Sequence, residues 1–431
     1  MGTDIYSLIN ICVYSCLWLF TFIIYFIKKK YLDPAGLIIL SLIVYSAFSY
    51  FLFSSEFYYF TAVNFLPFLY LYFMLLIALF PLMRFEPRGK FFHSPNRYIF
   101  NFICILFIIP SIVQLPQIIS GFFDNIFLLF LDDQIGKEIY EEAMDRSYDN
   151  GSGVSNLPAI ITGAFQNIGF FLLFFSLGMK SRNKLIIVGL IISCFSLLLS
   201  AISSGQRGLI MEVVFSFVIS FFAFRFFLSH RVRNYITFSM GLILMSVIFP
   251  IIALTNSRFE SSKEGAESSV VYYLGQANLY FNNYAFDNGG IQYGDRTIPL
   301  FKRMVGINNV PKNFWERRLK YSSLKINDSV FVSFVGDFVF DYGPFLSVIL
   351  FVFYSLFVVL LTTIRNKKIY IHQFLLLHFT MCVCFLGGLK SFTFADVGGN
   401  LQIILYFILI VFFFVVDKFD WTHIKYNGLS K

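Results

Sequence analysis

The sequence predicts an all-α fold, a polytopic membrane helix bundle with about eleven transmembrane helices. Of its 431 residues, 58% are hydrophobic and 13% are charged, and the mean hydropathy is +0.73. Soluble domains are roughly 45–50% apolar and about 25% charged. The apolar residues gather in runs of about 20, the length that crosses a hydrocarbon core as a helix. We therefore expect a single membrane domain over residues 1–431.

The predicted crossings follow one another along the whole chain. They lie at residues 5–27, 35–53, 62–83, 99–119, 158–178, 185–204, 208–228, 235–254, 344–364, 370–389 and 400–416. The first has no basic residues before it and no small-residue cleavage site, so we expect a retained helix and not a signal peptide. All six cysteines fall inside these runs, which argues against a disulfide framework or a metal site.

The basic residues between the runs predict the topology. Clusters of Lys and Arg follow every odd-numbered run, at 28–30, 84–97, 180–184, 231–233 and 365–368. Short cytoplasmic loops carry such an excess of Lys and Arg. The alternation therefore predicts an N-terminus outside the cell and a cytoplasmic C-terminal tail. The basic residues behind the net charge of +8 lie mostly in these short clusters between apolar runs. We therefore interpret the positive charge as a sign of membrane topology and not of nucleic-acid binding.

Two extracytoplasmic segments are predicted to be large. Residues 132–157 form an acidic outer loop with seven Asp or Glu residues, for which the simplest interpretation is a solvated loop. Residues 255–343 form the large outer loop, too long for a simple connector, and such loops are usually functional. Its last part, 329–343, is too short and polar to span, and Gly343-Pro344 is expected to start the ninth crossing.

Two arginines are the main candidates for binding an anion. Arg207 follows Gln206 in the turn Ser-Gly-Gln-Arg-Gly, between two crossings at the predicted outer interface. A guanidinium there forms bidentate bonds to phosphate or carboxylate; the alternative is an arginine that snorkels or pairs with Glu212. Arg258 opens the large outer loop. Together with Arg296 and the basic run that follows, it predicts an outward cationic zone suited to a pyrophosphate head group, or else a basic loop beside anionic lipids.

Two acids are candidates for proton transfer. Asp337 and Asp341 are four residues apart and share one face of a helix. They are expected either to supply a general base or to cap the helix and pair with a nearby arginine. No histidine falls in a predicted outer segment, which argues against an imidazole base there. The chain has no Walker motif, dinucleotide fingerprint or nucleophile elbow, so ATP-driven transport and soluble-type hydrolysis lack support.

These features resemble the O-antigen and capsule repeat-unit polymerases, the Wzy-type family. The resemblance rests on many crossings with two large outer loops, on the Ser204–Gly208 turn and on Arg258 at the start of the main loop. It also rests on Asp341-Tyr342-Gly343 at the end of that loop.

The resemblance implies a bacterial inner-membrane glycosyltransferase, with a glycosyltransferase C-like architecture as one form of the bundle. A growing glycan on undecaprenyl pyrophosphate would pass to the next lipid-linked repeat unit of a lipopolysaccharide or capsule, without a metal or other cofactor. Arg207 and Arg258 would hold the donor pyrophosphate, and we add Asp337 as the catalytic base. The expected substrate-binding residues are Gln206, Arg296, Tyr273, Asn278, Asp341 and Tyr342.

The expected partners are the lipid-linked donor and acceptor, membrane lipids, a chain-length regulator and a flippase, with no nucleic acid. For Tyr273 and Asn278, packing of a half-buried helix is the alternative to sugar contact.

Three rival functions stay open. An O-antigen ligase would have a histidine in the main outer loop, which is absent here. A lipid-linked oligosaccharide flippase would place polar or broken helices near the midplane. A non-catalytic membrane scaffold would not need an arginine flanked by glycines, such as Arg207 in the Ser204–Gly208 turn.

Overall fold

The structure is a computed structural model that describes residues 4–55, 60–93, 95–131, 157–179, 183–204, 207–242, 245, 266–325, 330–363 and 367–418. Within these ranges the regular structure is helical, apart from one pair of two-residue strands. The all-α prediction is therefore confirmed for the described part of the chain.

The first half of the chain contains α1 (Ile5–Lys29), α2 (Pro34–Ser54), α3 (Phe65–Arg84), β1 (Phe91–Phe92), α4 (Arg97–Leu131), α6 (Leu157–Ala164), α7 (Gln166–Gly178), α8 (Lys184–Ser203) and α9 (Arg207–Phe224). Residues 230–242 are also helical. The second half contains α11 (Ala266–Tyr280), the π-helix η2 (Phe281–Ala285), α12 (Pro299–Met304), α13 (Phe314–Lys320), α14 (Ser333–Thr362), β2 (Lys368–Ile369), α15 (Ile371–Leu389) and α16 (Asp396–Lys418).

Many of these helices are long and apolar enough to cross a membrane. In the described part of the chain there are eight, or nine if α6 and α7, which are bent by 60° to one another, form one span. A shorter apolar helix covers Gly208–Phe224. The predicted eighth crossing, 235–254, lies outside the described residues from 246 onward. The chain is thus a multi-pass membrane protein, and the number eleven stays a prediction.

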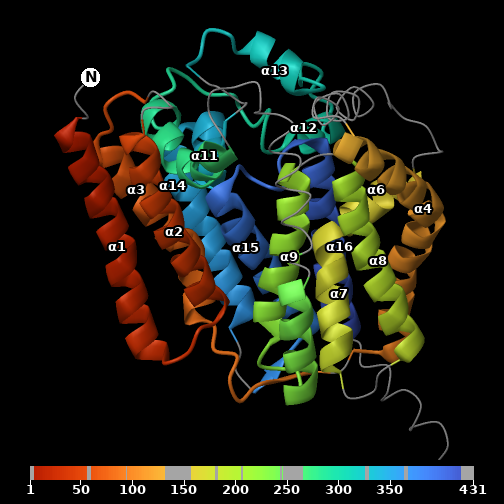
Figure 1. The fold of residues 1–431 in the computed structure, drawn as a ribbon. Helices are drawn as coiled ribbons and strands as arrows, with labels where there is room; N and C mark the ends of the chain where they lie inside the picture. Colours follow the sequence, from red (N-terminus) through yellow and green to blue (C-terminus); the bar gives the residue numbers. More distant parts are fainter. Residues whose placement is uncertain are drawn as a thin grey trace, which may run out of the picture.

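The two ends of the bundle carry different structures. At one end, here named the cap end, lie α11, α12, α13 and the start of α1 (Figure 1). At the other, the strand end, β1 pairs in parallel with β2. Lys29 lies 3.2 Å from Glu86 at the strand end, and the ring of Phe92 lies 4.3 Å from that of Phe227. Four of the loops predicted to be basic and cytoplasmic therefore meet there, as the alternation requires.

Local sequence explains where several helices begin. Asp33 caps α2 by accepting a hydrogen bond from the backbone N–H of Gly36, and Pro34 occupies the first turn, where its missing N–H costs nothing. Within α14, Gly343 has φ 75° and ψ 166°, a backbone conformation that residues with a Cβ rarely adopt. The predicted break at Gly343-Pro344 is confirmed, and a short helical segment over 333–342 precedes the long crossing.

The core of the bundle surrounds α15. This helix is almost entirely buried and contacts α2, α3, α7, α9, α14 and α16. Helix α11, which the sequence places in the outer loop, packs closely along the cap-end half of α2. A Cβ on Gly275 would lie 2.5 Å from the backbone oxygen of Phe48, so only glycine permits this approach. Part of the large predicted outer segment is thus an integral part of the bundle.

Candidate functional site

A buried ion pair lies at the cap end of the bundle. Nε of Arg296 lies 2.7 Å from Oδ1 of Asp337, and the two side chains are 7% and 0% exposed. The other oxygen of Asp337 accepts a hydrogen bond from the backbone N–H of Phe392 at 2.5 Å. Asp337 thereby joins three segments that are far apart in sequence, the start of α14, the 287–298 loop and the 390–395 loop. A buried pair of this kind needs both members, because an unpaired buried charge is costly.

Asp341, one helical turn further on, holds the same loop against α14. Its Oδ2 accepts hydrogen bonds from the backbone N–H of Thr297 at 2.7 Å and from the Thr297 hydroxyl at 2.6 Å. Its Oδ1 accepts from the backbone N–H of Arg296 at 3.3 Å. The hydroxyl of Tyr342 lies 3.1 Å from that of Thr297. The spacing of four residues predicted that the two acids share a face, and both face the Arg296-Thr297 segment.

A third acid, Asp295, lies nearer the surface of the cap end. Its carboxylate is fully buried, forms ion pairs with Lys302 and Lys320, and accepts a hydrogen bond from the hydroxyl of Tyr321 at 2.8 Å. Burial alone raises the pKa of Asp295, but these hydrogen bonds outweigh it and the net pKa is below its usual value. Burial, together with the carboxylate of Asp295, raises the pKa of the Tyr321 hydroxyl. The acid therefore stays ionised and ties α12 to α13.

A second ion pair connects α9 to this region. Nζ of Lys390 lies 2.6 Å from Oε1 of Glu212 and 3.1 Å from the backbone oxygen of Gly208. Lys390 is only two residues before Phe392, whose N–H binds Asp337. The beginning of α9 and the Arg296–Asp337 pair therefore meet in one corner of the cap end, here named the α9 corner and defined by Gly208, Glu212, Lys390 and Phe392.

Arg207 is the first residue of α9 and directly precedes Gly208, so its backbone belongs to the α9 corner. Its side chain, and all of Gln206 and Arg258, lie outside the described part of the structure. The pairing of Arg207 with Glu212, which the sequence left open as an alternative, has a competitor, because Glu212 already binds Lys390. Position 207 thus lies at the same end of the bundle as Asp337 and Arg296.

Two predicted sugar-contacting residues, Tyr273 and Asn278, lie on α11. Asn278 is buried, accepts a hydrogen bond from the Tyr14 hydroxyl at 3.3 Å and donates one to the Ser49 hydroxyl at 3.0 Å. These contacts fit the packing alternative for this residue. Tyr273 lies with its ring 5.8 Å from that of Phe331, whose ring in turn lies 5.8 Å from Nζ of Lys390. Tyr273 is therefore one aromatic ring away from the α9 corner.

An apolar groove leads from the membrane face to this region. Its cap-end part has a volume of about 360 Å³, is lined by α3, α14 and α15 and ends at Phe338 and Phe392. Its strand-end part, of about 450 Å³, is lined by α14, α15 and α16 and reaches His372. Phe357 and Phe379 line both parts, so the two parts are neighbours. Phe338, which lines the cap-end part, directly follows Asp337 in the sequence.

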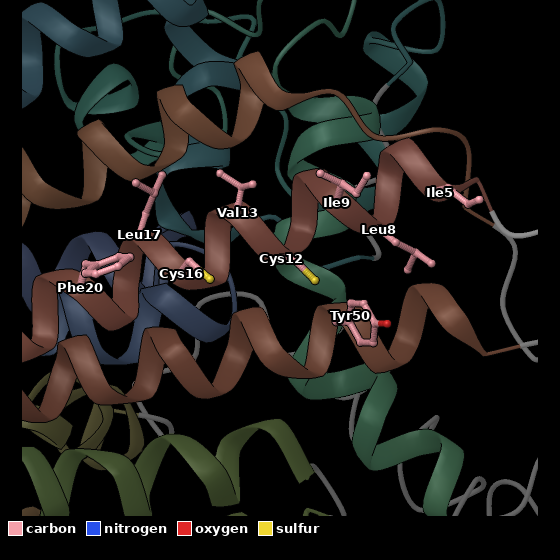
Figure 2. A pocket seen from close by; sticks show the side chains of 9 residues that line it. All are labelled: Ile5, Leu8, Ile9, Cys12, Val13, Cys16, Leu17, Phe20 and Tyr50. Atoms are coloured by element: carbon pink, nitrogen blue, oxygen red, sulfur yellow. The ribbon is translucent and has the colours of Figure 1, made fainter.

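Another apolar groove lies between α1 and α2, near the cap end (Figure 2). It is about 450 Å³ in volume and no charged side chain lines it. Tyr50 projects from α2 beside Cys12 of α1, and both cysteines of this groove, Cys12 and Cys16, are exposed at the lipid face. Because no acidic or basic side chain and no histidine lines this groove, we interpret it as a lipid-facing surface and not as a reaction site.

Two functional candidates were missed by the sequence reasoning. Lys390 is a lone basic residue in a short loop predicted to be outside, where Lys and Arg are depleted; that exception was a usable signal. Asp295 sits in a turn whose partners are seven and 25 residues further on, and nothing in their spacing reveals the cluster.

Comparisons of the chain with family models, with curated proteins and with solved structures find no match.

Proposed function

We propose that this protein is a polymerase that joins lipid-linked oligosaccharide repeat units at the outer face of a bacterial inner membrane. In this proposal the cap end faces outward and the strand end faces the cytoplasm. The donor is a glycan on undecaprenyl pyrophosphate and the acceptor is the terminal sugar of another lipid-linked unit. The protein is thus a glycosyltransferase of surface polysaccharide synthesis.

The observation that carries the proposal is the α9 corner. The bond between Lys390 and the backbone oxygen of Gly208 brings the last residue of the Ser-Gly-Gln-Arg-Gly turn next to the Arg296–Asp337 pair. This turn is one motif on which the family resemblance rests, and Asp337 lies one helical turn before another, Asp341-Tyr342-Gly343, which is far away in sequence. Their convergence at one end supports a site that binds a pyrophosphate group with several cations.

Catalysis of this reaction depends on stabilising the charge of the leaving group and needs no covalent bond between the protein and the substrate. The acceptor hydroxyl oxygen forms a bond to the anomeric carbon of the donor, while the bond from that carbon to the pyrophosphate oxygen breaks. The departing pyrophosphate gains negative charge, which Arg207 and Arg258 stabilise, and Lys390, bonded to the backbone of Gly208, supplies a further cation. The hydroxyl proton passes to a carboxylate, for which Asp337 is the candidate once a bound anion draws Arg296 away from it.

The apolar groove supports a lipid-linked substrate. It opens toward the bilayer along α14, where Phe353 and Leu360 are 72% and 75% exposed, and closes on Phe338 and Phe392. A polyprenyl tail in the groove would place its pyrophosphate near Asp337 and Arg296. The apolar, largely aromatic lining suits a hydrocarbon tail, and the charged Asp337 and Arg296 lie beyond Phe338, where an anionic head would be placed.

Reconstitution tests the proposal directly. The purified protein in nanodiscs is incubated with a purified undecaprenyl-pyrophosphate-linked repeat unit, and the products are separated by size. Dimers and longer glycans on one lipid support the proposal. Unchanged substrate in the presence of folded protein, with lipid-linked units from several polysaccharide types, contradicts it.

A lipid-linked oligosaccharide transporter is the second candidate, because the interior of the bundle is more polar than its sequence suggested. Asn167 donates to Gln402 at 2.8 Å, and the hydroxyl of Ser220 lies 2.7 Å from Nε2 of the fully buried His378. The bend between α6 and α7 adds a broken helix beside Asn167. Movement of a fluorescent lipid-linked oligosaccharide across proteoliposomes, without any lengthening of the glycan, favours this function over polymerisation.

A further inference from the structure

A polar hollow on the surface of the cap end has no role in the site described above. It has a volume of about 550 Å³, and its lining is formed by α13, the turn after it and one residue of the 287–298 loop. Small-molecule sites have volumes of roughly 300–1,000 Å³. The lining residues are Gln292, Trp315, Arg318, Leu319, Tyr321, Ser322 and Leu324. We name it the α13 hollow.

Part of the wall of the α13 hollow is one face of α13. Trp315, Arg318 and Leu319 are three and four residues apart, the spacing that places side chains on one side of an α-helix, and Ser322 adds a hydroxyl from the turn that follows. Trp315 is 56% exposed, although an indole ring on a soluble surface is usually covered. Arg318 is exposed and forms no ion pair with any described residue. The wall thus offers an open aromatic face beside a free guanidinium.

The floor of the hollow contains an unsatisfied acceptor. Gln292 is 1% exposed, and its side-chain oxygen Oε1 accepts no hydrogen bond within the described structure. Its backbone is held firmly, because its N–H donates to the oxygen of Phe340 at 2.8 Å and its carbonyl accepts from the Tyr321 hydroxyl at 2.9 Å. Buried acceptors are usually satisfied, so this one points to a donor supplied by a ligand.

We propose that the α13 hollow binds sugar rings of the growing glycan. A sugar ring has apolar C–H faces and many hydroxyl donors. Its face stacks on Trp315, and its hydroxyls donate to Gln292 and Ser322 and accept from Arg318. A rigid aromatic side chain such as Trp315, with a polar group such as Arg318 next to it, suits a ligand whose ring carries many hydroxyls. A protein partner would need a broader apolar surface than Trp315, Leu319 and Leu324 provide.

This inference rests on the proposed function and specifies where the glycan lies. The hollow is connected to the reaction site through short contacts, because Tyr321 binds Asp295 and the N–H of Gln292 binds Phe340 of α14. Binding here holds the glycan beside Asp337 and Arg296 without contacting the reacting atoms. The residues of the α13 hollow are therefore positioning residues, and their loss should shorten chains and raise KM for the donor, which carries the growing glycan, more than it lowers kcat.

Binding without turnover tests the inference separately from the polymerase activity. The full-length protein in nanodiscs is applied to an array of bacterial oligosaccharides of two to six sugars. We expect binding of one or more glycans, reduced about tenfold or more by Trp315→Ala and by Arg318→Ala and retained by Trp315→Phe. Met304→Ala and Lys312→Ala, exposed residues of the same end that do not line the hollow, serve as matched controls and should bind normally.

The outcomes are distinct from those of the polymerase test. If no glycan binds, or if Trp315→Ala binds as well as the wild type, the inference is overturned even when the wild type polymerises. If glycans bind through Trp315 and no polymer forms, the hollow is supported and the polymerase proposal fails. If Trp315→Ala leaves glycan binding intact and instead abolishes co-purification of a protein partner, the hollow is a protein-docking surface and the inference is wrong.

Discussion

Lys390 lies with its Nζ 2.6 Å from Oε1 of Glu212, and this contact brings the loop after α15 to the beginning of α9. Both side chains are mostly buried, 15% and 19% exposed. A charged hydrogen bond in such a setting contributes about 1.5–3 kcal/mol to stability. The same lysine binds the backbone oxygen of Gly208, next to Arg207. The pair therefore has a structural role, and we propose a second role in binding the donor.

The two roles of Lys390 can be separated by exchanging the charges. Lys390→Ala is expected to lower the melting temperature and to abolish long glycans. The double variant Lys390→Glu with Glu212→Lys restores an opposite-charge pair and should recover most of the stability. It should not recover polymerisation, because the cation then lies on α9 and no longer on the loop beside Phe392. Thermal unfolding in detergent and the length distribution of the glycan products on a gel are both measured. If the double variant restores stability and long glycans together, Lys390 is purely structural.

The buried pair of Arg296 and Asp337 is expected to be strongly coupled. Arg296→Ala leaves a buried carboxylate without its cation and should destabilise the protein by about 3–5 kcal/mol. The double variant Arg296→Met with Asp337→Leu removes both charges and should be close to the wild type in stability, again without polymerising. Denaturation curves of the single and double variants give the coupling energy. A melting temperature of Arg296→Ala equal to that of the wild type would refute the coupling.

Arg207 and Arg258 are expected to act on the leaving group. Arg207→Ala and, separately, Arg258→Ala should be expressed and folded normally yet make no long chains, with rates lowered about 10²–10³-fold, as for loss of one donor to a developing oxyanion. Arg231→Ala, an exposed residue at the start of the helical segment 230–242 on the strand-end side, is the matched control and should polymerise normally. Glycan products of wild-type length from both Arg207→Ala and Arg258→Ala would show that the assigned roles are wrong.

The Asp295 cluster predicts an acid-sensitive cap end. Because the pKa of Asp295 is lower in the folded protein than its usual value, its stabilising effect is complete above the unfolded pKa of about 3.9 and is lost as the pH falls through the folded pKa. Asp295→Asn should therefore lower the melting temperature at pH 5–8. Its difference from the wild type should shrink below about pH 4. A difference that stays constant or grows under acid would contradict the ion pairs with Lys302 and Lys320.

Much of the fold was predictable from hydrophobic runs because each run is long enough to span by itself. The break at Gly343-Pro344 was predictable for a local reason, the conformational freedom of glycine and the missing N–H of proline. The packing of α11 on α2 was not, because it depends on the approach of Gly275 to Phe48, 227 positions earlier in the chain. A polar, aromatic stretch reads as a surface loop until its neighbours are known.

The candidate site, like the fold, was predictable from the sequence only in part. Asp337 and Asp341 were identified because their spacing places them on one helical face, which is local information. That Asp337 binds Arg296, and that Asp341 binds the next residue, depends on how the 287–298 loop folds back onto α14. Gln292 and Trp315 became candidates only through an unsatisfied polar atom, the exposure of an indole ring and the hollow that both residues line. Such relationships are set by tertiary packing, which a single sequence does not display.

The central claim is that a glycosidic bond forms at the cap end as undecaprenyl pyrophosphate leaves. The most direct measurement follows a purified, radiolabelled lipid-linked repeat unit with the nanodisc-reconstituted protein and quantifies both products. The account predicts one molecule of free undecaprenyl pyrophosphate for each new sugar linkage, with neither product formed by Arg207→Ala. Translocated but unlengthened substrate, or release of undecaprenyl pyrophosphate without new linkages, would contradict it.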